Sequence, residues 1–463
     1  MQGRLLLSAL LVSAAASSAR AQTPTSPPAQ PASADLQQVL QRLDRLEEQN
    51  RALLTEIRAL REQVAPKSGP TEASAAQETA PYAAKLEDRV EVQEQRTAQL
   101  DQEKISTEHK LPLTLTGMLL ANSFWTGRGG GGSDNPTLAP QTHGPVDAGG
   151  TFRQSVIGAK FDGLDIVGGG KITGSVYGDF YGGTGVTLNQ LMRLRVASVN
   201  AIWKNTTVTL ALDKPIIAPR EPDSLAQVGV SPLTSAGNLW LWQPQIRMEQ
   251  RFQFGDQSGL RAQAGVYETA EGGTGLSGTE YAGTLSKSRP GYEGRFEFWK
   301  AGGENRRIEI APGFHFSSSR VIGESAPSQI FSIDWLVRPF SRLDFTGQFF
   351  QGENVGVLGG LRQGVTVLNE QARSVGAKGG WAQVKLRLTS RLSMNLYGGQ
   401  EDDRNSDLRS GQIGKNQIYA GNLMYRLGSN VVTAFESSQT RTTYLGSGTR
   451  IFPHYDLAVA YLF

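Results

Sequence analysis

The segment Tyr455-Asp456-Leu457-Ala458-Val459-Ala460-Tyr461-Leu462-Phe463 decides the fold of this chain. Successive side chains of a β-strand point to opposite faces, so the odd-numbered residues, all aromatic or aliphatic, share one face. The even-numbered residues, mostly small or polar, share the other face. A strand with lipid on one side and a water-filled interior on the other has this pattern. The same alternation also permits an edge strand of a soluble β-sandwich, so the rest of the chain must distinguish the two.

The N-terminal residues are typical of a secretory signal. Arg4 supplies a positive charge, residues 5–16 form an apolar core, and Ala19-Arg20-Ala21 matches a cleavage site, so we expect a signal peptide over residues 1–21. The apolar core is too short to span a membrane as a helix, and no later segment replaces it. The chain has no Cys, which excludes a lipid-anchored lipoprotein and any disulfide. A closed β-barrel is then the remaining way to span a membrane.

The composition agrees with a barrel. Only 38% of the 463 residues are hydrophobic, and 54 are Gly, as expected when apolar residues are needed at every second wall position and Gly at turns. The net charge of +3 is too small to indicate a nucleic-acid partner. Length alone does not decide, because a chain of this size could also form two or three soluble domains.

A linker over residues 22–34, rich in Pro, Ser, Ala and Gln, is followed by a heptad pattern over residues 35–64. The narrow apolar stripe predicts an α-helical coiled coil and therefore self-association, although a lone amphipathic helix packed on the barrel is the alternative. Asn50 is a polar residue of the kind that fixes register, and it does not decide between dimer and trimer. The residues expected at the helix contact are Leu36, Val39, Leu43, Leu46, Asn50, Leu53, Ile57 and Leu60.

Two further segments separate the coiled coil from the barrel. Residues 65–82, rich in Pro, Ala and Ser, form a second linker. Residues 83–110 are highly charged and have few apolar positions at heptad spacing, so we interpret them as a helical spacer.

From residue 111 to 463 the hydrophobic period is two, and the connections alternate between short turns and long Gly-rich loops. Strict alternation predicts an antiparallel transmembrane β-barrel with periplasmic turns and external loops, whereas a soluble sandwich has no reason to sort its connections. Seven turns and eight loops give sixteen strands. The long loops are expected near 127–150, 182–190, 214–238, 270–290, 317–328, 353–375, 401–416 and 441–453.

Alternation also assigns side chains to the lumen; for example, Met192, Leu194, Val196 and Ile202 are assigned to the lipid face, which sets Arg193 and Arg195 inward. Arg is always charged and pairs well with carboxylates, so a row of Arg on adjacent strands favours passage of anions. The alternative is a mixed network in which these Arg only neutralise Glu249, Glu297 and Asp334. The basic residues assigned to the lumen are Arg193, Arg195, Arg247, Arg251, Arg261, Arg295, Lys385 and Arg387. We expect Arg247 and Arg251, immediately after the third long loop, to contribute most to selectivity.

The third long loop holds four Pro residues, which stiffen a loop and prevent regular strand pairing. Arg220, Glu221 and Asp223 lie between them. The loop is therefore the candidate constriction of the lumen. The alternative is an external loop that shields a subunit contact.

No catalytic or cofactor motif stands out. The four His (His109, His143, His315 and His454) lack metal-ligand spacing, and no G-x-S-x-G motif is present. An outer-membrane lipase using His143 and a Ser remains only a formal alternative. We expect neither enzymatic activity nor a cofactor or metal.

The segment Gln243-Pro244-Gln245-Ile246-Arg247, after a Pro-rich third loop, resembles the DcaP-like outer-membrane porins, as does the order of signal, coiled coil and sixteen-strand barrel. The resemblance implies a trimer that takes up small anions, dicarboxylates among them. The N-terminal helix is also similar to that of sucrose-type porins, which have an aromatic slide for sugars. Trp125, Trp240 and Trp242 could be taken for such a slide, but alternation assigns Trp242 to the lipid side.

The sequence thus predicts a bacterial outer-membrane porin for passive diffusion of small hydrophilic solutes, with a preference for anions such as dicarboxylates. Its expected partners are other copies of the chain, the lipid bilayer, small anionic solutes and, through the N-terminal helices, peptidoglycan. Two alternatives stay open: a structural protein that tethers the outer membrane to the cell wall, and a sugar-specific porin.

Overall fold

The computed structural model describes residues 112–130, 134–142, 144–183, 190–276, 278–286, 289–303 and 305–463. The predicted signal peptide, coiled coil, linkers and spacer lie outside these residues. In the described part of the chain, no helix has the length and hydrophobicity needed to cross a membrane.

The described residues form one large sheet and a small hairpin. The large sheet contains β1 (Leu113–Thr126), β2 (Asp147–Thr151), β3 (Val156–Ile166), β4 (Gly170–Gly182), β5 (Leu191–Ile202), β6 (Thr206–Asp213), β7 (Gln243–Gly255), β8 (Ser258–Glu268), β9 (Pro290–Ala301), β10 (Arg307–Val321), β11 (Glu324–Phe340), β12 (Leu343–Glu353), β15 (Gly376–Arg387), β16 (Leu392–Asp403), β17 (Ile413–Arg426), β18 (Val431–Tyr444) and β19 (Gly448–Leu462). The hairpin is β13 (Val365–Leu368) with β14 (Gln371–Ser374), and the described loops hold the 3-10 helices η1 (Glu271–Thr274), η2 (Ala282–Thr284), η3 (Val355–Leu358) and η4 (Asn405–Asp407).

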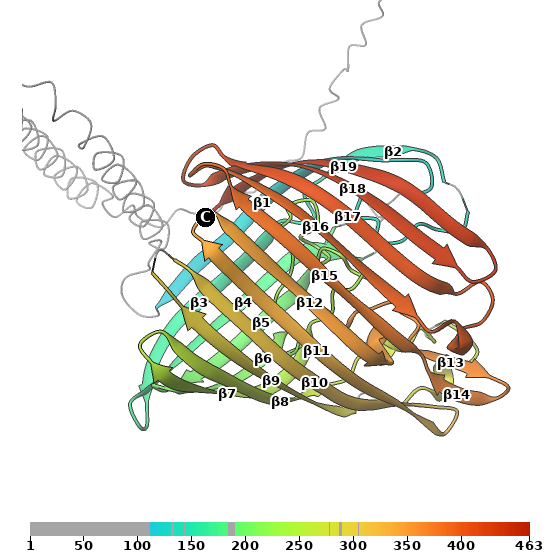
Figure 1. Ribbon diagram of the computed structural model, residues 1–463, viewed down its shortest axis with the longest axis horizontal. Coiled ribbons are helices and arrows are strands. Elements are labelled where there is room, and N and C mark those ends of the chain that lie inside the picture. The colour runs from blue at the N-terminus through green and yellow to red at the C-terminus, as the bar shows by residue number, and fades with distance from the viewer. Residues whose placement is uncertain are drawn as a thin grey trace, which may run out of the picture. The chain divides into compact units, whose positions relative to one another are not determined.

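The large sheet closes on itself as an antiparallel barrel (Figure 1). β1 pairs with β19 from Met118 opposite Leu462 to Thr126 opposite His454. β2 and β3 pair with different halves of β1, so together they fill one position in the wall. Counted this way, the seventeen strands of the sheet make sixteen wall positions, which confirms the predicted barrel.

Side-chain exposure confirms the alternation in the last strand. Tyr455, Leu457, Val459 and Tyr461 are 38–54% exposed on the outer face, where lipid would cover them. Their neighbours Asp456, Ala458 and Ala460 are at most 2% exposed on the inner face. The inner face of this strand is buried because loop residues, described below, fill the lumen beside it.

Two of the eight predicted long loops are instead tight turns. β10 and β11 continue to Val321 and from Glu324, so residues 322–323 alone connect them. β18 and β19 are likewise joined by residues 445–447. The polar, Ser- and Thr-rich ends of these strands were interpreted as loop, but the hairpins extend beyond the apolar part of the wall.

A β-bulge changes the facing of β5. Tyr177 pairs with Val196 and the next residue, Gly178, pairs with Leu194, so Arg195 is an extra residue in β5. Arg193 and Arg195 keep their predicted inward direction, since both contact Asp179. The prediction that Val196 and Ile202 share the outer face of Met192 and Leu194 is wrong, because the inserted residue shifts the alternation.

The candidate constriction and its charged contacts

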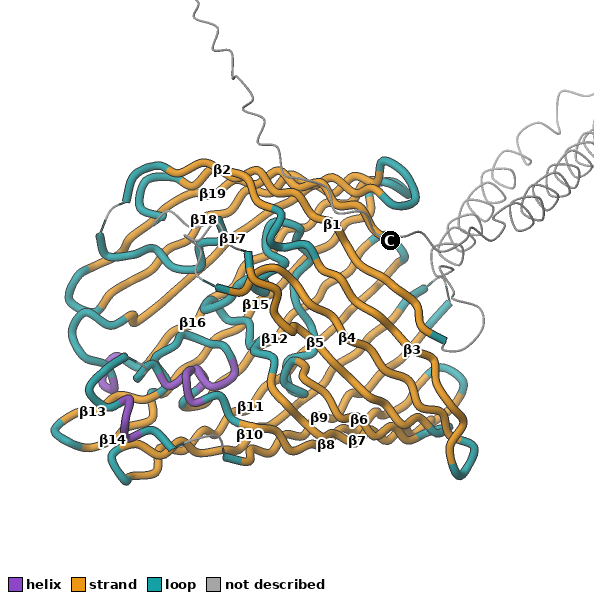
Figure 2. The backbone as a smooth tube through the Cα atoms, turned by 180° about the vertical axis from the view of Figure 1, so that it is seen from behind, coloured by secondary structure: helices purple, strands orange, loops and turns teal. Residues whose placement is uncertain are grey.

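The third long loop, residues 214–242 and hereafter loop 3, lies inside the barrel. Ile217, Leu233 and Leu239 are fully buried, and Figure 2 shows loop segments within the ring of strands. Wall residues on separate sides hold its backbone: Gln348 of β12 donates to the Ile217 carbonyl at 3.1 Å, and Asn122 of β1 donates to the Leu225 carbonyl at 2.9 Å. Loop 3 therefore crosses the lumen and does not shield the barrel from outside.

Arg220 fixes one side of loop 3 to the acidic residues of the wall. Its Nε donates to Asp334 of β11 at 2.8 Å, and its Nη2 lies 3.4 Å from Glu297 of β9. Glu309 of β10 accepts a further hydrogen bond from the same Nη2. One cation of the loop thus contacts carboxylates from three adjacent strands.

Arg295 of β9 completes this charged cluster from the wall. Its side chain is fully buried, and it pairs with Asp334 at 2.7 Å and with Glu297 at 2.7 Å. Arg261 of β8 reaches Glu297 at 2.5 Å. The predicted inward direction of Arg261 and Arg295 agrees with the structure, but both are neutralised by acids. Here the structure matches the mixed network rather than a row of free cations.

Asp223, three residues further along loop 3, contacts β15. Its Oδ2 accepts a hydrogen bond from Gln383 of β15 at 2.6 Å, and its Oδ1 lies 3.3 Å from Lys385 Nζ. Two residues further along β15, Arg387 pairs with Asp344 at 2.6 Å, and Asp344 also accepts from Arg338 at 2.6 Å. Two guanidinium groups therefore share one carboxylate at this place.

Arg193 and Arg195 lie against loop 3 and share Asp179, at 2.7 and 3.1 Å. Arg195 also donates to the Val228 carbonyl of loop 3 at 2.5 Å. The Trp242 ring lies 4.8 Å from the Arg195 guanidinium, so the predicted lipid-facing position of Trp242 is wrong. β7 begins only at residue 243, and strand alternation does not extend to Trp242.

Arg247 and Arg251 lie below loop 3, near the short-turn end of the barrel. Arg247 pairs with Asp213 at 2.9 Å, and Arg251 pairs at 2.7 Å with Glu249, which Arg261 also reaches at 3.8 Å. Both arginines line a lumen cavity of about 390 Å³ between β5, β6 and β7. Because both arginines are paired with acids, they are weaker candidates for anion selection than the sequence suggested.

Glu221 is held by loop 3 itself rather than by the wall. It pairs with Lys214 at 2.6 Å and accepts from Ser231. Burial alone would raise its pKa, but Lys214, Ser231 and Arg195 together outweigh burial and hold the pKa of Glu221 below its usual range. A carboxylate with a lowered pKa contributes stability that is present above its usual pKa and is lost as the pH falls through the lowered value. This contact is therefore intact at neutral pH.

A second inserted loop was not identified from the sequence. Residues 354–375 between β12 and β15 also enter the lumen, where Val357 and Leu358 pack with Ile217 and Leu239 of loop 3. The buried carboxylate of Glu401 accepts from the Leu361 backbone at 2.8 Å, and Asp403 accepts from Gln363 at 2.7 Å. The apolar run within this Gly-rich loop is the sequence feature that could have indicated its entry into the lumen.

The described residues contain no group of three or more His, Cys, Asp or Glu side chains able to hold a metal ion. His315 contacts Tyr267, Glu293 and Ser317, but it is fully buried. Glu293 in turn accepts from the Ile216 backbone of loop 3, so this cluster serves to hold the loop.

Comparison with known proteins gives structural matches alone. No family model matches the chain, and no curated protein matches it. The outer membrane channel DcaP of Acinetobacter baumannii matches with a TM-score of 0.60 and 13% identity, over 76% of this chain and 97% of that one. An anion-selective porin from Comamonas acidovorans matches at 0.47 and 12%, over 76% and 100%. OmpT of Vibrio cholerae matches at 0.45 and 8%, over 77% and 99%. The barrel therefore has the fold of the DcaP channel, and the resemblance predicted from residues 243–247 is confirmed at the level of the fold.

Proposed function

We propose that this chain is a porin of the bacterial outer membrane, through which small hydrophilic solutes diffuse passively with a preference for anions. The observation that supports it best is loop 3, which crosses the lumen: Arg220 anchors it to β9, β10 and β11, and Asn122 of β1, on the opposite side of the barrel, holds the Leu225 carbonyl. An apolar outer face surrounds a charged interior, as passage of water-soluble molecules across a bilayer requires. The shared porin fold is consistent with this function and with no catalytic activity.

The anion preference rests on places where cations outnumber acids. Arg193 and Arg195 share Asp179, and Arg338 and Arg387 share Asp344. Each group leaves one positive charge uncompensated within the lumen, where low-dielectric walls strengthen its field. Arg391 and Arg426 form no ion pair within the described residues, but neither do the buried carboxyl groups of Glu401, Asp403, Glu436 and Asp456, so the preference is expected to be moderate. Dicarboxylates fit this arrangement because a carboxylate forms two parallel hydrogen bonds with Arg.

Replacing Arg193 and Arg195 together by Gln should move the reversal potential under a salt gradient toward cation preference. The pair contacts loop 3, the narrow part of the lumen, and its removal leaves Asp179 unpaired. Replacing Arg247 and Arg251 by Gln should act in the same direction but less, since both line the cavity below loop 3 and the Arg251 side chain is largely exposed, where solvent screens its charge. The measurement is made in planar bilayers at low salt, where the Debye length exceeds about 10 Å.

Arg306→Gln serves as the control, because this exposed arginine lies in a short turn and, among the described residues, its side chain hydrogen-bonds only to the Gly303 carbonyl. An unchanged reversal potential in the Arg193/Arg195 variant would leave the mixed charge network as the better interpretation. Absence of regular open-channel steps in the natural protein would instead favour the structural, tethering alternative.

We further propose that the barrel assembles with other copies of itself, as a trimer. Gln417 lies nine residues above the short-turn end of β17, as Phe316 does in β10 and Ile246 in β7. At the same height above the short turns, therefore, the wall that contains β7 and β10 carries apolar side chains on its outer face, and the wall that contains β17 carries polar ones. The outward polar residues on the latter wall are Gln351, Lys378, Gln400, Gln417 and Gln439, which share faces with exposed apolar residues of the same strands.

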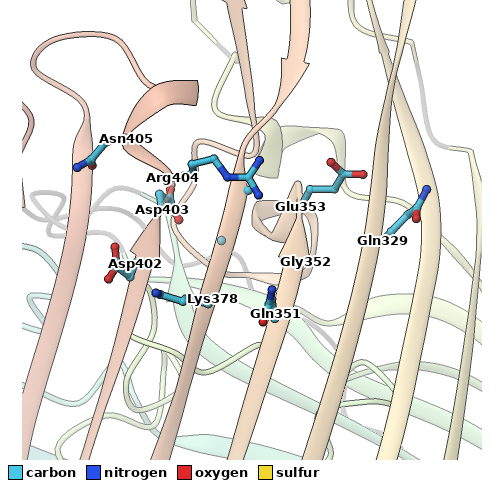
Figure 3. Close-up of a pocket in the computed structure, with 11 residues that line it drawn as sticks. Gln329, Gln351, Gly352, Glu353, Lys378, Asp402, Asp403, Arg404 and Asn405 are labelled. Atoms are coloured by element: carbon cyan, nitrogen blue, oxygen red, sulfur yellow. The ribbon is translucent and has the colours of Figure 1, made fainter.

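This polar wall would be costly in contact with lipid, where amide groups lack hydrogen-bond partners. It continues into a hollow of about 560 Å³ on the outer face, where Figure 3 shows Lys378, Asp402 and Glu353 at the far ends of their strands. Both charge signs are present, so the same face of a second copy is a suitable partner. The predicted coiled coil over residues 35–64 would hold the copies together.

Because the chain has no Cys, a single introduced thiol reports on one place only. In outer membranes, Gln439→Cys should form a covalent dimer with a short bis-maleimide, whereas Ile246→Cys, on the opposite wall, should stay monomeric on denaturing gels. Equal cross-linking of both variants, or none of Gln439→Cys, would contradict the assignment of this wall to the subunit contact.

A further inference from the structure

A second cavity lies between loop 3 and the short-turn end of the barrel. It has a volume of about 360 Å³, and residues from β1, β15, β16, β17, β18 and β19 line it with Leu225 of loop 3. Since a water molecule occupies about 30 Å³, the cavity corresponds to about twelve waters. It is distinct from the cavity beside Arg247 and Arg251, with which it shares no lining residue.

One side of this cavity is apolar although it faces the lumen. Met118, Met424 and Val432 project inward, and Val432 pairs with Ala460 on the buried face of β19. Leu225 closes the upper side, held in place by the Asn122 hydrogen bond to its carbonyl. A wall made only for water and ions needs no such residues, because exposing apolar surface to water is unfavourable.

The other side of the cavity is basic. Lys385 and Arg387 are partly neutralised by Asp223 and Asp344. Arg391 and Arg426 also line the cavity, and within the described residues neither forms an ion pair. No carboxylate lines the cavity itself. Two guanidinium groups are thus available to a ligand beside an apolar surface.

We infer that this cavity binds anions that carry a hydrocarbon body, such as alkyl carboxylates of six to eight carbons. The carboxylate would accept hydrogen bonds from Arg391 and Arg426, and the chain would lie against Met118, Met424 and Val432. The inference rests on the proposed function in one respect, that the solute arrives through the lumen. It narrows the solute class from small anions in general to amphipathic ones.

The test measures how strongly acetate, butanoate, hexanoate and octanoate reduce the chloride current through the purified channel in planar bilayers. Each methylene buried against the apolar wall should lower the half-blocking concentration by up to about fourfold. The double variant Arg391→Gln/Arg426→Gln should weaken the block by all four anions. Met424→Gln/Val432→Thr should flatten the dependence on chain length while leaving the effect of acetate unchanged. Calorimetry of octanoate with the purified barrel gives the same comparison without requiring current.

Arg306→Gln is the matched control, since it removes a charge at the same end of the barrel outside the cavity. A block that does not depend on chain length, or that survives both double variants, would overturn the inference. Anion preference without chain-length dependence would contradict the proposed cavity site and still support the proposed function. A cation-preferring channel would contradict the proposed anion preference. If its block still depended on chain length, and Arg391→Gln/Arg426→Gln abolished that dependence, the cavity site would be supported.

Discussion

Replacing Arg295 by Met should lower the free energy of unfolding by about 3–5 kcal/mol, the usual cost of removing one partner from a buried ion pair. The Arg295 side chain is fully buried between Asp334 and Glu297, each 2.7 Å away. Without it, two carboxylates stay buried with only Arg220 and Arg261 to compensate them. Urea unfolding of the barrel in lipid vesicles, followed by tryptophan fluorescence, gives the measurement.

Arg306→Met is the control for this experiment and should leave the unfolding midpoint unchanged, because surface substitutions usually have small effects. Adding Asp334→Asn to Arg295→Met should restore part of the lost stability by removing one uncompensated charge. If Arg295→Met unfolds at the same urea concentration as the natural protein, the buried cluster does not stabilise the barrel.

Replacing Arg220 by Gln should release one side of loop 3 and raise the single-channel conductance. The arginine is the contact of loop 3 with Asp334, Glu297 and Glu309, and Gln is too short and uncharged to replace it. A hydrogen bond to a charged group contributes about 1.5–3 kcal/mol, so the ratio of released to anchored loop should rise between about tenfold and a hundredfold. Current recordings should show larger and noisier openings.

Arg362→Gln provides the same substitution on the neighbouring inserted loop, at an exposed side chain, and should leave the conductance unchanged. Asp223→Asn, which weakens a second anchor of loop 3, to β15, should change the current in the same direction as Arg220→Gln. A lower conductance in either anchor variant would mean that these contacts hold the passage open rather than narrow.

The barrel could be predicted because its pattern is local. Alternation along each strand depends only on neighbouring residues, and the exposed and buried faces of β19 follow it. The wrong predictions of side-chain facing concern positions at which the regular strand pattern is interrupted. One inserted residue, Arg195, shifts the facing of Val196 and Ile202, and nothing in the residue types marks the insertion. Trp242 follows loop geometry rather than strand geometry, because it lies one residue before β7.

The pairing of charged side chains in the lumen is a feature that the sequence could not specify. The inward direction of Arg261 and Arg295 was predicted, but the balance between cations and acids was not. Arg220 and its partner Asp334 lie 114 residues apart, and Asp223 and Gln383 lie 160 apart. Such pairs exist only once loop 3 has entered the barrel, so no spacing along the chain could reveal them.

The pairing of β1 with β19 has a consequence for the order of assembly. The two strands form the final junction of the ring, and contacts this distant in sequence form late because a long segment must be ordered first. Loop 3 contacts Asn122 of β1, and its Leu225 and Val228 pack against a buried cluster that contains Leu120 of β1 and Ala458 and Ala460 of β19. Loop 3 therefore contacts both strands of the closing junction. Entry of the loop into the lumen and closure of the ring should then stabilise each other during assembly.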